Sequence, residues 1–244
     1  MAMKKNISKA MAMAVTLTVL SGANLFGMNG VAEAAEPNIY GAGNGTMTPV
    51  LGSAQPSYNK LTILSINELL EQGSPYTNIY AGHAPSSGGD SLGNNVTIDE
   101  DVTVRSVYGG YAVSGSANSN KIYIKGTADA DVNGGCVYPK TASSTTDSNY
   151  VEVSGSASDL VCGGRDATNA NNNEVVITET GEASDVKGAA CSGEATGNTV
   201  TIAGTVSGEV YGGDGKTSAT GNTVIITGKA TSDTSVIFGG YSGK

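Results

Sequence analysis

Residues 94–98 read Asn-Asn-Val-Thr-Ile, and their pattern of Asn, a variable residue, a β-branched residue, a variable residue and a second β-branched residue recurs along the chain. Both β-branched positions hold Val or Ile in every copy. Alternation of this kind is typical of a short strand that buries one face, so each copy predicts one strand of a repeat. The copies are spaced 24 to 29 residues apart and begin at Asn94, Asn120, Asn149, Asn173, Asn198 and Asn222.

A second motif follows each of these strands and consists of an apolar residue two positions ahead of a Gly-rich pair. Val107-Tyr108-Gly109-Gly110 is one copy, and Ile79-Tyr80-Ala81-Gly82 is a degenerate earlier one. Two-residue hairpin signals are not placed systematically between the strands, whereas a coil per repeat would pair each strand in parallel with its equivalent in the next coil. The further copies begin at Val132, Val161, Val186, Val210 and Ile237.

These two motifs predict an all-β fold, a right-handed parallel β-helix (β-solenoid) of about six coils with a short N-terminal cap. Val and Ile columns would fill the interior, the repeated Asn would form an amide ladder at a tight turn, and Gly would occupy the corners. The composition agrees, because the chain has 35 Gly and only 13 aromatic residues among 244, with no Trp. Thirteen Lys and Arg against 22 Asp and Glu give a net charge of −9, which excludes the basic surface that nucleic-acid binding needs.

The first 34 residues are predicted to be a secretory signal peptide. Three Lys residues precede a short apolar stretch from Ala10 to Leu20, and Ala32-Glu33-Ala34 offers the small residues of a cleavage site. Cleavage before Ala35 would remove three Lys and one Glu, so the exported chain would carry a charge of −11. We therefore expect a secreted or cell-surface protein.

The rest of the chain is predicted to divide at residue 93. Residues 35–92 would form an irregular N-terminal segment and a solenoid cap, and residues 93–244 the repeats, incomplete at the C-terminus. Within the cap, at 57–92, Ser65-Ile66-Asn67-Glu68 is a capping-box pattern ahead of Leu69, with Gly73 as a stop, and it predicts a short helix over 66–72. A cap of this kind would cover the open edge of the first coil.

The predicted signal peptide, the acidic net charge and the two repeated motifs together resemble the passenger regions of Gram-negative autotransporters, the type V secreted adhesin-like proteins. The resemblance covers roughly residues 78–244 and implies display on the outer surface. It also implies a C-terminal outer-membrane barrel, which this sequence does not contain, so the expected membrane link lies outside the chain; a free-standing secreted solenoid is the alternative.

The function expected from the resemblance is an adhesin-like interaction scaffold, whose partner would be a host or cell-surface glycan or protein. Two alternatives stay open: a carbohydrate-active parallel β-helix enzyme, such as a polysaccharide lyase or hydrolase, and a structural surface spacer. An enzyme of that kind needs clustered carboxylates near a basic residue. The only two Arg, Arg105 and Arg165, occupy different repeat positions, and the densest acidic group, 99–101, is expected to be a solvated strand end.

No catalytic residue, cofactor or metal ligand is assigned. Three carboxylates, Asp131, Asp185 and Glu209, precede the second motif, with Asp159 displaced by one position, and they suggest either weak calcium binding or a screened acidic stripe. The odd number of cysteines argues against a disulfide framework and leaves their state open. The cysteines are Cys136, Cys162 and Cys191.

Two further features have structural explanations. Gly215-Lys216-Thr217 mimics the end of a phosphate loop, but its place in a repeat explains it, and the lone His83 is expected in a loop or the cap. One repeat position carries rings, which predicts aromatic stacking on one face or a strip for binding carbohydrate. Its residues are Tyr80, Tyr108, Tyr211 and Phe238, of which only the first two are expected to be adjacent.

Overall fold

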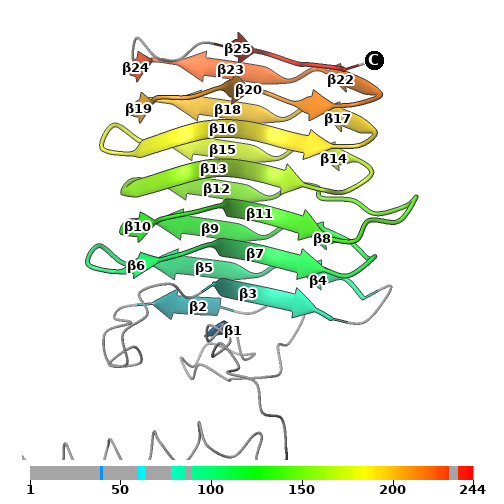
Figure 1. The fold of residues 1–244 in the computed structure, drawn as a ribbon, viewed down its shortest axis with the longest axis horizontal. Coiled ribbons are helices and arrows are strands. Elements are labelled where there is room, and N and C mark those ends of the chain that lie inside the picture. Colours follow the sequence, from blue (N-terminus) through cyan, green and yellow to red (C-terminus); the bar gives the residue numbers. More distant parts are fainter. Residues whose placement is uncertain (1–38, 41–59, 64–77, 86–88, 231–235, 244) are drawn as a thin grey trace, which may run out of the picture. The chain divides into compact units, whose positions relative to one another are not determined.

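The computed structural model describes residues 39–40, 60–63, 78–85, 89–230 and 236–243 (Figure 1). All of them belong to one compact unit, Glu36–Lys244. The predicted signal peptide and the predicted helix over 66–72 lie outside the described residues. No helix among the residues described here is long and apolar enough to cross a membrane.

The described chain is built from strands that wind into a parallel β-solenoid of about six coils, as the repeats predict. The largest sheet has 13 strands and is called the large sheet below. Its strands are β1 (Ile39–Tyr40), β3 (Ile79–Ala84), β6 (Thr103–Val104), β7 (Val107–Ala112), β10 (Thr127–Ala128), β11 (Val132–Val137), β13 (Ser156–Arg165), β16 (Glu182–Cys191), β19 (Thr205–Val206), β20 (Val210–Tyr211), β21 (Asp214–Gly215), β24 (Lys229–Ala230) and β25 (Ile237–Phe238).

A second sheet of seven strands, called the opposite sheet, contains the Asn-led motif. Two short sheets of three and two strands complete the coils. The opposite sheet consists of β2 (Lys60–Ile63), β5 (Asn95–Ile98), β9 (Lys121–Ile124), β12 (Tyr150–Val153), β15 (Glu174–Ile177), β18 (Thr199–Ile202) and β23 (Thr223–Ile226). The short sheets are β14 (Ala170–Asn171), β17 (Glu194–Thr196) and β22 (Ser218–Thr220), and β4 (Ser91–Leu92) with β8 (Ala117–Asn118).

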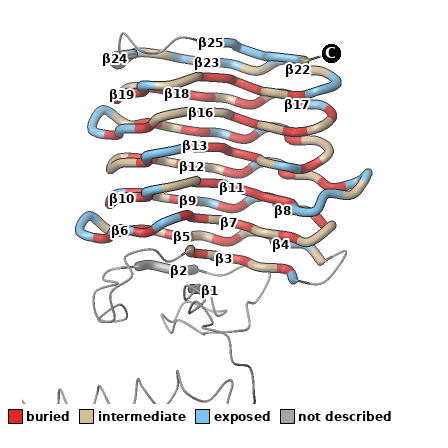
Figure 2. The backbone as a smooth tube through the Cα atoms, viewed as in Figure 1, coloured by how far each residue is buried: buried red, intermediate tan, exposed pale blue. Residues whose placement is uncertain are grey.

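Every strand pair is parallel and joins equivalent repeat positions. Val96 pairs with Ile122 and Ile98 with Ile124, and the same register continues through the opposite sheet to β23. The stacked Val and Ile side chains form one continuous core between the two sheets, and their coils show as buried segments in Figure 2. Because each apolar residue meets a similar residue above and below, a narrow interior packs without large aromatic side chains.

The predicted Asn ladder is present. Nδ2 of Asn120 donates to Oδ1 of Asn149 at 3.0 Å, and the backbone N–H of Asn120 donates to the same oxygen at 2.9 Å. From Asn120 onward each Nδ2 also donates to a backbone carbonyl, which for Asn149 is Ala117 O at 3.0 Å. The Nδ2 of Asn94 instead donates to Ser91 Oγ at 3.2 Å. The Asn ladder satisfies buried polar groups at the bend, because the hydrogen bonds between the strands do not reach them. It runs through Asn94, Asn120, Asn149, Asn173, Asn198 and Asn222.

Glycine occupies two kinds of position in each coil, and only one of them is the predicted corner. The corner residue comes directly before each ladder Asn and has φ between 55° and 68°; it is Gly93, Ser119, Ser148, Asn172, Gly197 or Gly221. The Gly pair of the second motif lies opposite, against the ladder: a Cβ on Gly163 would lie 2.5 Å from Gly188 O and 2.7 Å from Asn173 Cβ. These glycines are therefore required by two close approaches, one to the carbonyl of the next coil in the same sheet and one to the Asn ladder.

The repeat array begins earlier than the predicted boundary at residue 93. Strand β2 pairs in register with β5, with Leu61 opposite Val96 and Ile63 opposite Ile98, and β3 pairs with β7. The sequence before Val96 thus holds a further copy, Asn59-Lys60-Leu61-Thr62-Ile63, in which Leu61 replaces the β-branched residue. Part of the segment assigned to an irregular cap therefore belongs to the solenoid, because its strands pair in parallel with those of the next turn.

Candidate functional site

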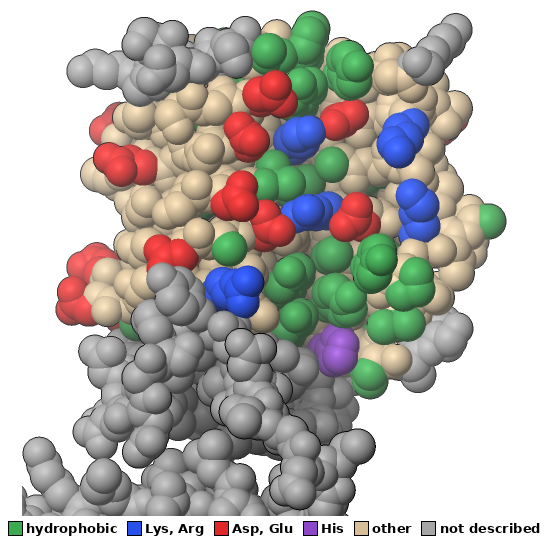
Figure 3. Space-filling view, viewed as in Figure 1, with side chains coloured by type: hydrophobic (Ala, Val, Ile, Leu, Met, Phe, Trp, Pro, Cys, Tyr) green, Lys and Arg blue, Asp and Glu red, His purple; other side chains and the backbone are tan. Residues whose placement is uncertain are grey.

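Two columns of side chains run along the outer face of the large sheet. The tyrosine column comprises Tyr80, Tyr108, Asn133, Cys162, Lys187, Tyr211 and Phe238, in register from strand to strand. The second, called the histidine column, comprises His83, Tyr111, Cys136, Arg165, Ala190, Asp214 and Tyr241. Figure 3 shows this face, with hydrophobic side chains gathered toward both ends and acidic and basic side chains between them.

The first aromatic cluster lies on β3 and β7. The rings of Tyr80 and Tyr108 stack with centroids 4.8 Å apart and planes 5° from parallel. Tyr111 stands at 90° to Tyr108 with centroids 5.6 Å apart, and its hydroxyl donates to Tyr138 O at 3.2 Å. Burial raises the pKa of Tyr108 to about 12 and lowers that of His83 from 6.5, so His83 is neutral at pH 7.

The predicted adjacency of Tyr80 and Tyr108 is confirmed, but a second aromatic cluster was missed. Tyr211 and Phe238 also come from neighbouring strands, with centroids 5.5 Å apart, and Tyr241 lies 5.9 Å from Tyr211. Phe238 and Tyr241 are exposed. The repeat pattern itself predicts this second cluster, because Tyr211 and Phe238 occupy the same repeat position in consecutive copies.

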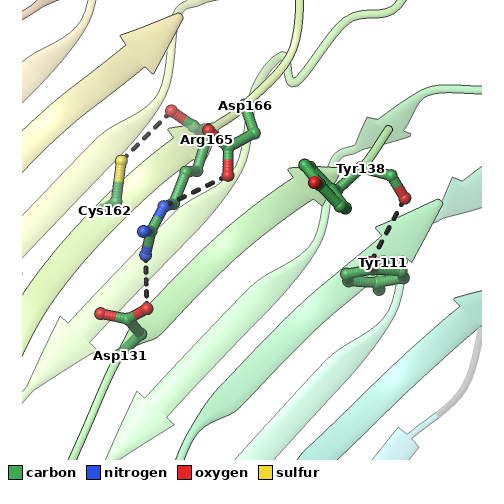
Figure 4. A network of polar contacts seen from close by, with 7 residues as sticks. Tyr111, Asp131, Tyr138, Cys162, Arg165 and Asp166 are labelled. Carbon is green, nitrogen blue, oxygen red and sulfur yellow. Dashed lines mark hydrogen bonds and ion pairs between the residues drawn. The ribbon is translucent and has the colours of Figure 1, made fainter. Parts of the chain in front are cut away.

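Two ion pairs join neighbouring coils between the clusters. Arg165 lies between two carboxylates, with Nη1 2.5 Å from Asp131 Oδ2 and Nε 3.4 Å from Asp166 Oδ2 (Figure 4). Lys187 Nζ lies 2.9 Å from Asp214 Oδ2 and 4.5 Å from the centroid of the Tyr211 ring. Both pairs are partly exposed, so they add little to stability.

Asn133 is the one buried asparagine of the described chain whose side chain has no hydrogen-bond partner. It is 0% exposed, and neither Nδ2 nor Oδ1 is bonded. It lies in the tyrosine column between Tyr108 and Cys162, and the Arg165–Asp131 pair crosses the column at that level, because Arg165 belongs to the neighbouring histidine column. A buried amide of this kind costs about 1 to 3 kcal/mol for each unsatisfied group.

The predicted carboxylate stripe is interrupted. Asp185 and Glu209 lie in neighbouring coils, where the Glu209 backbone N–H donates to Asp185 Oδ1 at 2.7 Å. Leu160 occupies the equivalent place one coil earlier, opposite Asp185, and Asp131 is committed to Arg165. Among the described residues no group of three His, Cys, Asp or Glu side chains is placed to hold a metal ion.

The remaining sequence candidates lie apart from this face or are engaged. Asp99, from the acidic group 99–101 at the turn after β5, lies 3.8 Å from Lys125 Nζ. Lys216 and Thr217 are exposed, but their backbone N–H groups donate to Cys191 O and Gly193 O, so they cannot cradle a phosphate.

All three cysteines are buried and free. Burial raises the pKa of each thiol, to about 12 for Cys162, whose Sγ donates to Gly164 O at 3.2 Å. A thiol that stays protonated is a poor nucleophile. These cysteines therefore act as small packing residues. Cys136 and Cys162 lie under the face, in the histidine and tyrosine columns respectively.

These features define a class of protein: a parallel β-solenoid with one sheet face bearing two aromatic clusters and a charged zone between them. No family model, curated protein or solved structure matches the chain.

Proposed function

We propose that the protein is a secreted or cell-surface interaction scaffold, adhesin-like in its action, whose contact surface is the outer face of the large sheet. The passenger region of an autotransporter-type protein is the setting in which we place it. The observation that carries the proposal is the gathering of aromatic side chains on this one face, in clusters that include Phe238 and Tyr241, both more than 40% exposed. Aromatic residues and Arg are the side chains enriched where proteins bind partners.

The rest of the fold suits such a role. The ladder and the interlocked core hold the strands in a fixed register, so the side chains of the face are presented at constant spacing. Many weak contacts along a regular array then add up to firm attachment. The charged zone favours specificity, because Arg165 and Lys187 lie beside Asp131 and Asp214, so the face presents both signs of charge.

Binding of the full chain to cells and to immobilised host glycoproteins tests the proposal. The variant Tyr108→Ser disrupts the first cluster, and Tyr123→Ser is its matched control, because Tyr123 packs on Tyr150 at 5.8 Å on the opposite sheet. We expect Tyr108→Ser to weaken attachment and Tyr123→Ser to leave it unchanged. Equal attachment by both variants and the unaltered chain would overturn the assignment of this face.

Export is tested separately by expressing the chain in a Gram-negative host and sequencing the N-terminus of the protein outside the cytoplasm. The proposal expects an N-terminus at Ala35. A chain that keeps Met1 and stays in the cytoplasm would exclude a secreted scaffold.

One observation favours a second candidate, a carbohydrate-active enzyme. Asp131 and Asp166 converge on Arg165 at the face, which is the combination of carboxylates and a basic residue that such enzymes use. Assay of the full chain against neutral and acidic polysaccharides, with Asp131→Asn as the variant, decides between the two. Release of reducing ends or unsaturated products that is lost in the variant would support the enzyme.

A further inference from the structure

The surroundings of Asn133 form a polar corner beside an aromatic ring. Tyr108 stacks on Tyr80 on one side, so its other ring face is turned along the column toward Asn133. Tyr111, perpendicular to Tyr108, forms a second wall, and Asp131 precedes the strand that carries Asn133. One aromatic ring, one unpaired amide and one carboxylate are thus carried by neighbouring positions on β7, on β11 and directly before β11 on this face.

Arg165 covers this corner. Its guanidinium reaches from the histidine column to Asp131, 34 residues earlier in the chain, and the side chains of Arg165 and Asp131 are 30% and 27% exposed. A pair exposed to this degree is held weakly, because water competes for both charges. The unpaired amide beneath it favours any arrangement in which Arg165 moves aside and another group bonds Asn133.

The hydrogen-bonding capacity of the corner selects among ligands. Nδ2 of Asn133 needs an acceptor and its Oδ1 needs a donor. The Asp131 carboxylate accepts from Arg165, and it would need another donor if Arg165 moved aside. A cationic group supplies donors only and leaves Nδ2 unbonded. An anionic group supplies acceptors only and meets the charges of Asp131 and Asp166. A pair of neighbouring hydroxyls on a sugar ring supplies both, and the apolar face of the ring can lie on an aromatic side chain.

We propose that Asn133, Asp131 and Tyr108 form a binding site for a neutral pyranose of a glycan, which Arg165 covers in the unliganded protein. The inference rests on the proposed function and names the partner chemistry for the first aromatic cluster. The sugar stacks on Tyr108, and two of its hydroxyls bond Asn133 and Asp131. Arg165 keeps its pairing with Asp166 when the site is occupied.

Titration of the full chain with single sugars, followed by NMR of the Asn133 side-chain NH2 group, tests the site. The probes are methyl β-galactoside, methyl α-mannoside and N-acetylglucosamine, with glucuronate and spermidine as the anionic and cationic controls. We expect at least one neutral sugar to shift the Asn133 signal saturably, and neither control to do so. A shift produced only by glucuronate or spermidine, or by no probe, would overturn the proposal. The absence of any shift would indicate that only water occupies the site.

Two variants separate binding from structure, with saturation-transfer NMR of the sugar as the readout. Asn133→Leu keeps the volume and removes the unpaired amide, so the fold is retained while affinity falls about tenfold or more. Arg165→Met keeps the packing of the stem but removes the cover, so affinity rises by about threefold or more. Unchanged affinity in Asn133→Leu, with its melting temperature preserved, would refute the site.

The outcome is distinguishable from failure of the proposed function. If Asn133→Leu still attaches to cells while Tyr108→Ser does not, the face is the contact surface but this sugar site is wrong. If neither the unaltered chain nor any variant attaches to cells or glycoproteins, the scaffold proposal itself fails, whatever the sugar titration gives.

Discussion

Replacing a central ladder residue, Asn149→Ala, is the sharpest test of what holds the coils together. The side chain is 1% exposed. It accepts two hydrogen bonds from Asn120 at 2.9 and 3.0 Å, and donates two, to Ala117 O and Asn173 Oδ1, both at 3.0 Å. The substitution therefore removes four bonds and leaves the backbone N–H and one amide hydrogen of Asn120 unpaired in a buried place.

The expected loss follows from these groups. Unsatisfied buried groups cost about 1 to 3 kcal/mol each, and a small cavity is left beside the Gly pair, so the free energy of unfolding should fall by about 4 kcal/mol. That is a large share of the stability of an ordinary domain. Urea unfolding followed by far-ultraviolet circular dichroism measures it, since the chain has no Trp to report by fluorescence.

Two matched variants control the measurement. Asn95→Ala removes an Asn side chain that points outward from the next position of the motif, and it should change stability by less than about 0.5 kcal/mol. Asn222→Ala removes the last ladder residue, which is half-buried, so water can replace part of what is lost and the effect should be intermediate. If Asn149→Ala costs no more than Asn95→Ala, the ladder is not what stabilises the bends.

Three further outcomes are expected. Gly163→Ala places a Cβ 2.5 Å from Gly188 O and should lower the free energy of unfolding by at least about 2 kcal/mol. Its control is Gly239→Ala, at the same position of the last coil, where the Cβ meets nothing nearer than 3.6 Å and the change should be nearly neutral. Similar losses of stability for both variants in urea unfolding would contradict this account. Ser148→Gly relieves a left-handed backbone, φ 57°, and should raise the melting temperature, with a gain of up to about 1 kcal/mol; a decrease would show that the corner is unstrained. Burial lowers the pKa of His83, so the unfolded chain takes up the proton first: stability contributed by the neutral ring is present above pH 6.5 and is lost as pH falls from there toward the folded-state pKa. His83→Gln should therefore melt with less pH dependence between pH 7.5 and 5.5, and an identical pH profile would refute the argument.

The repeats were sufficient to predict the architecture. Equivalent residues such as Val96 and Ile122 are 26 positions apart because one coil takes that many residues, so spacing alone indicates what stacks on what. The same reasoning missed the coil at 60–63 because Leu61 departs from the β-branched rule, although the Asn-x-Leu-x-Ile pattern was there to be found. It also assigned all glycines to corners, whereas the Gly pair is required by close contact with the next coil and with the Asn ladder, which periodicity does not reveal.

What the sequence by itself determined is the contents of each column: the Val and Ile core, the Asn ladder, the net charge, and the shared position of the rings. What only the tertiary structure decided is how different columns meet on the outer face. Arg165 and Asp131 occupy unlike repeat positions, 34 residues apart, and they pair because a long side chain reaches diagonally from one coil to the column beside it. The corner around Asn133 arises from that crossing, since stacking is a property of equivalent positions and the site joins positions that are not equivalent.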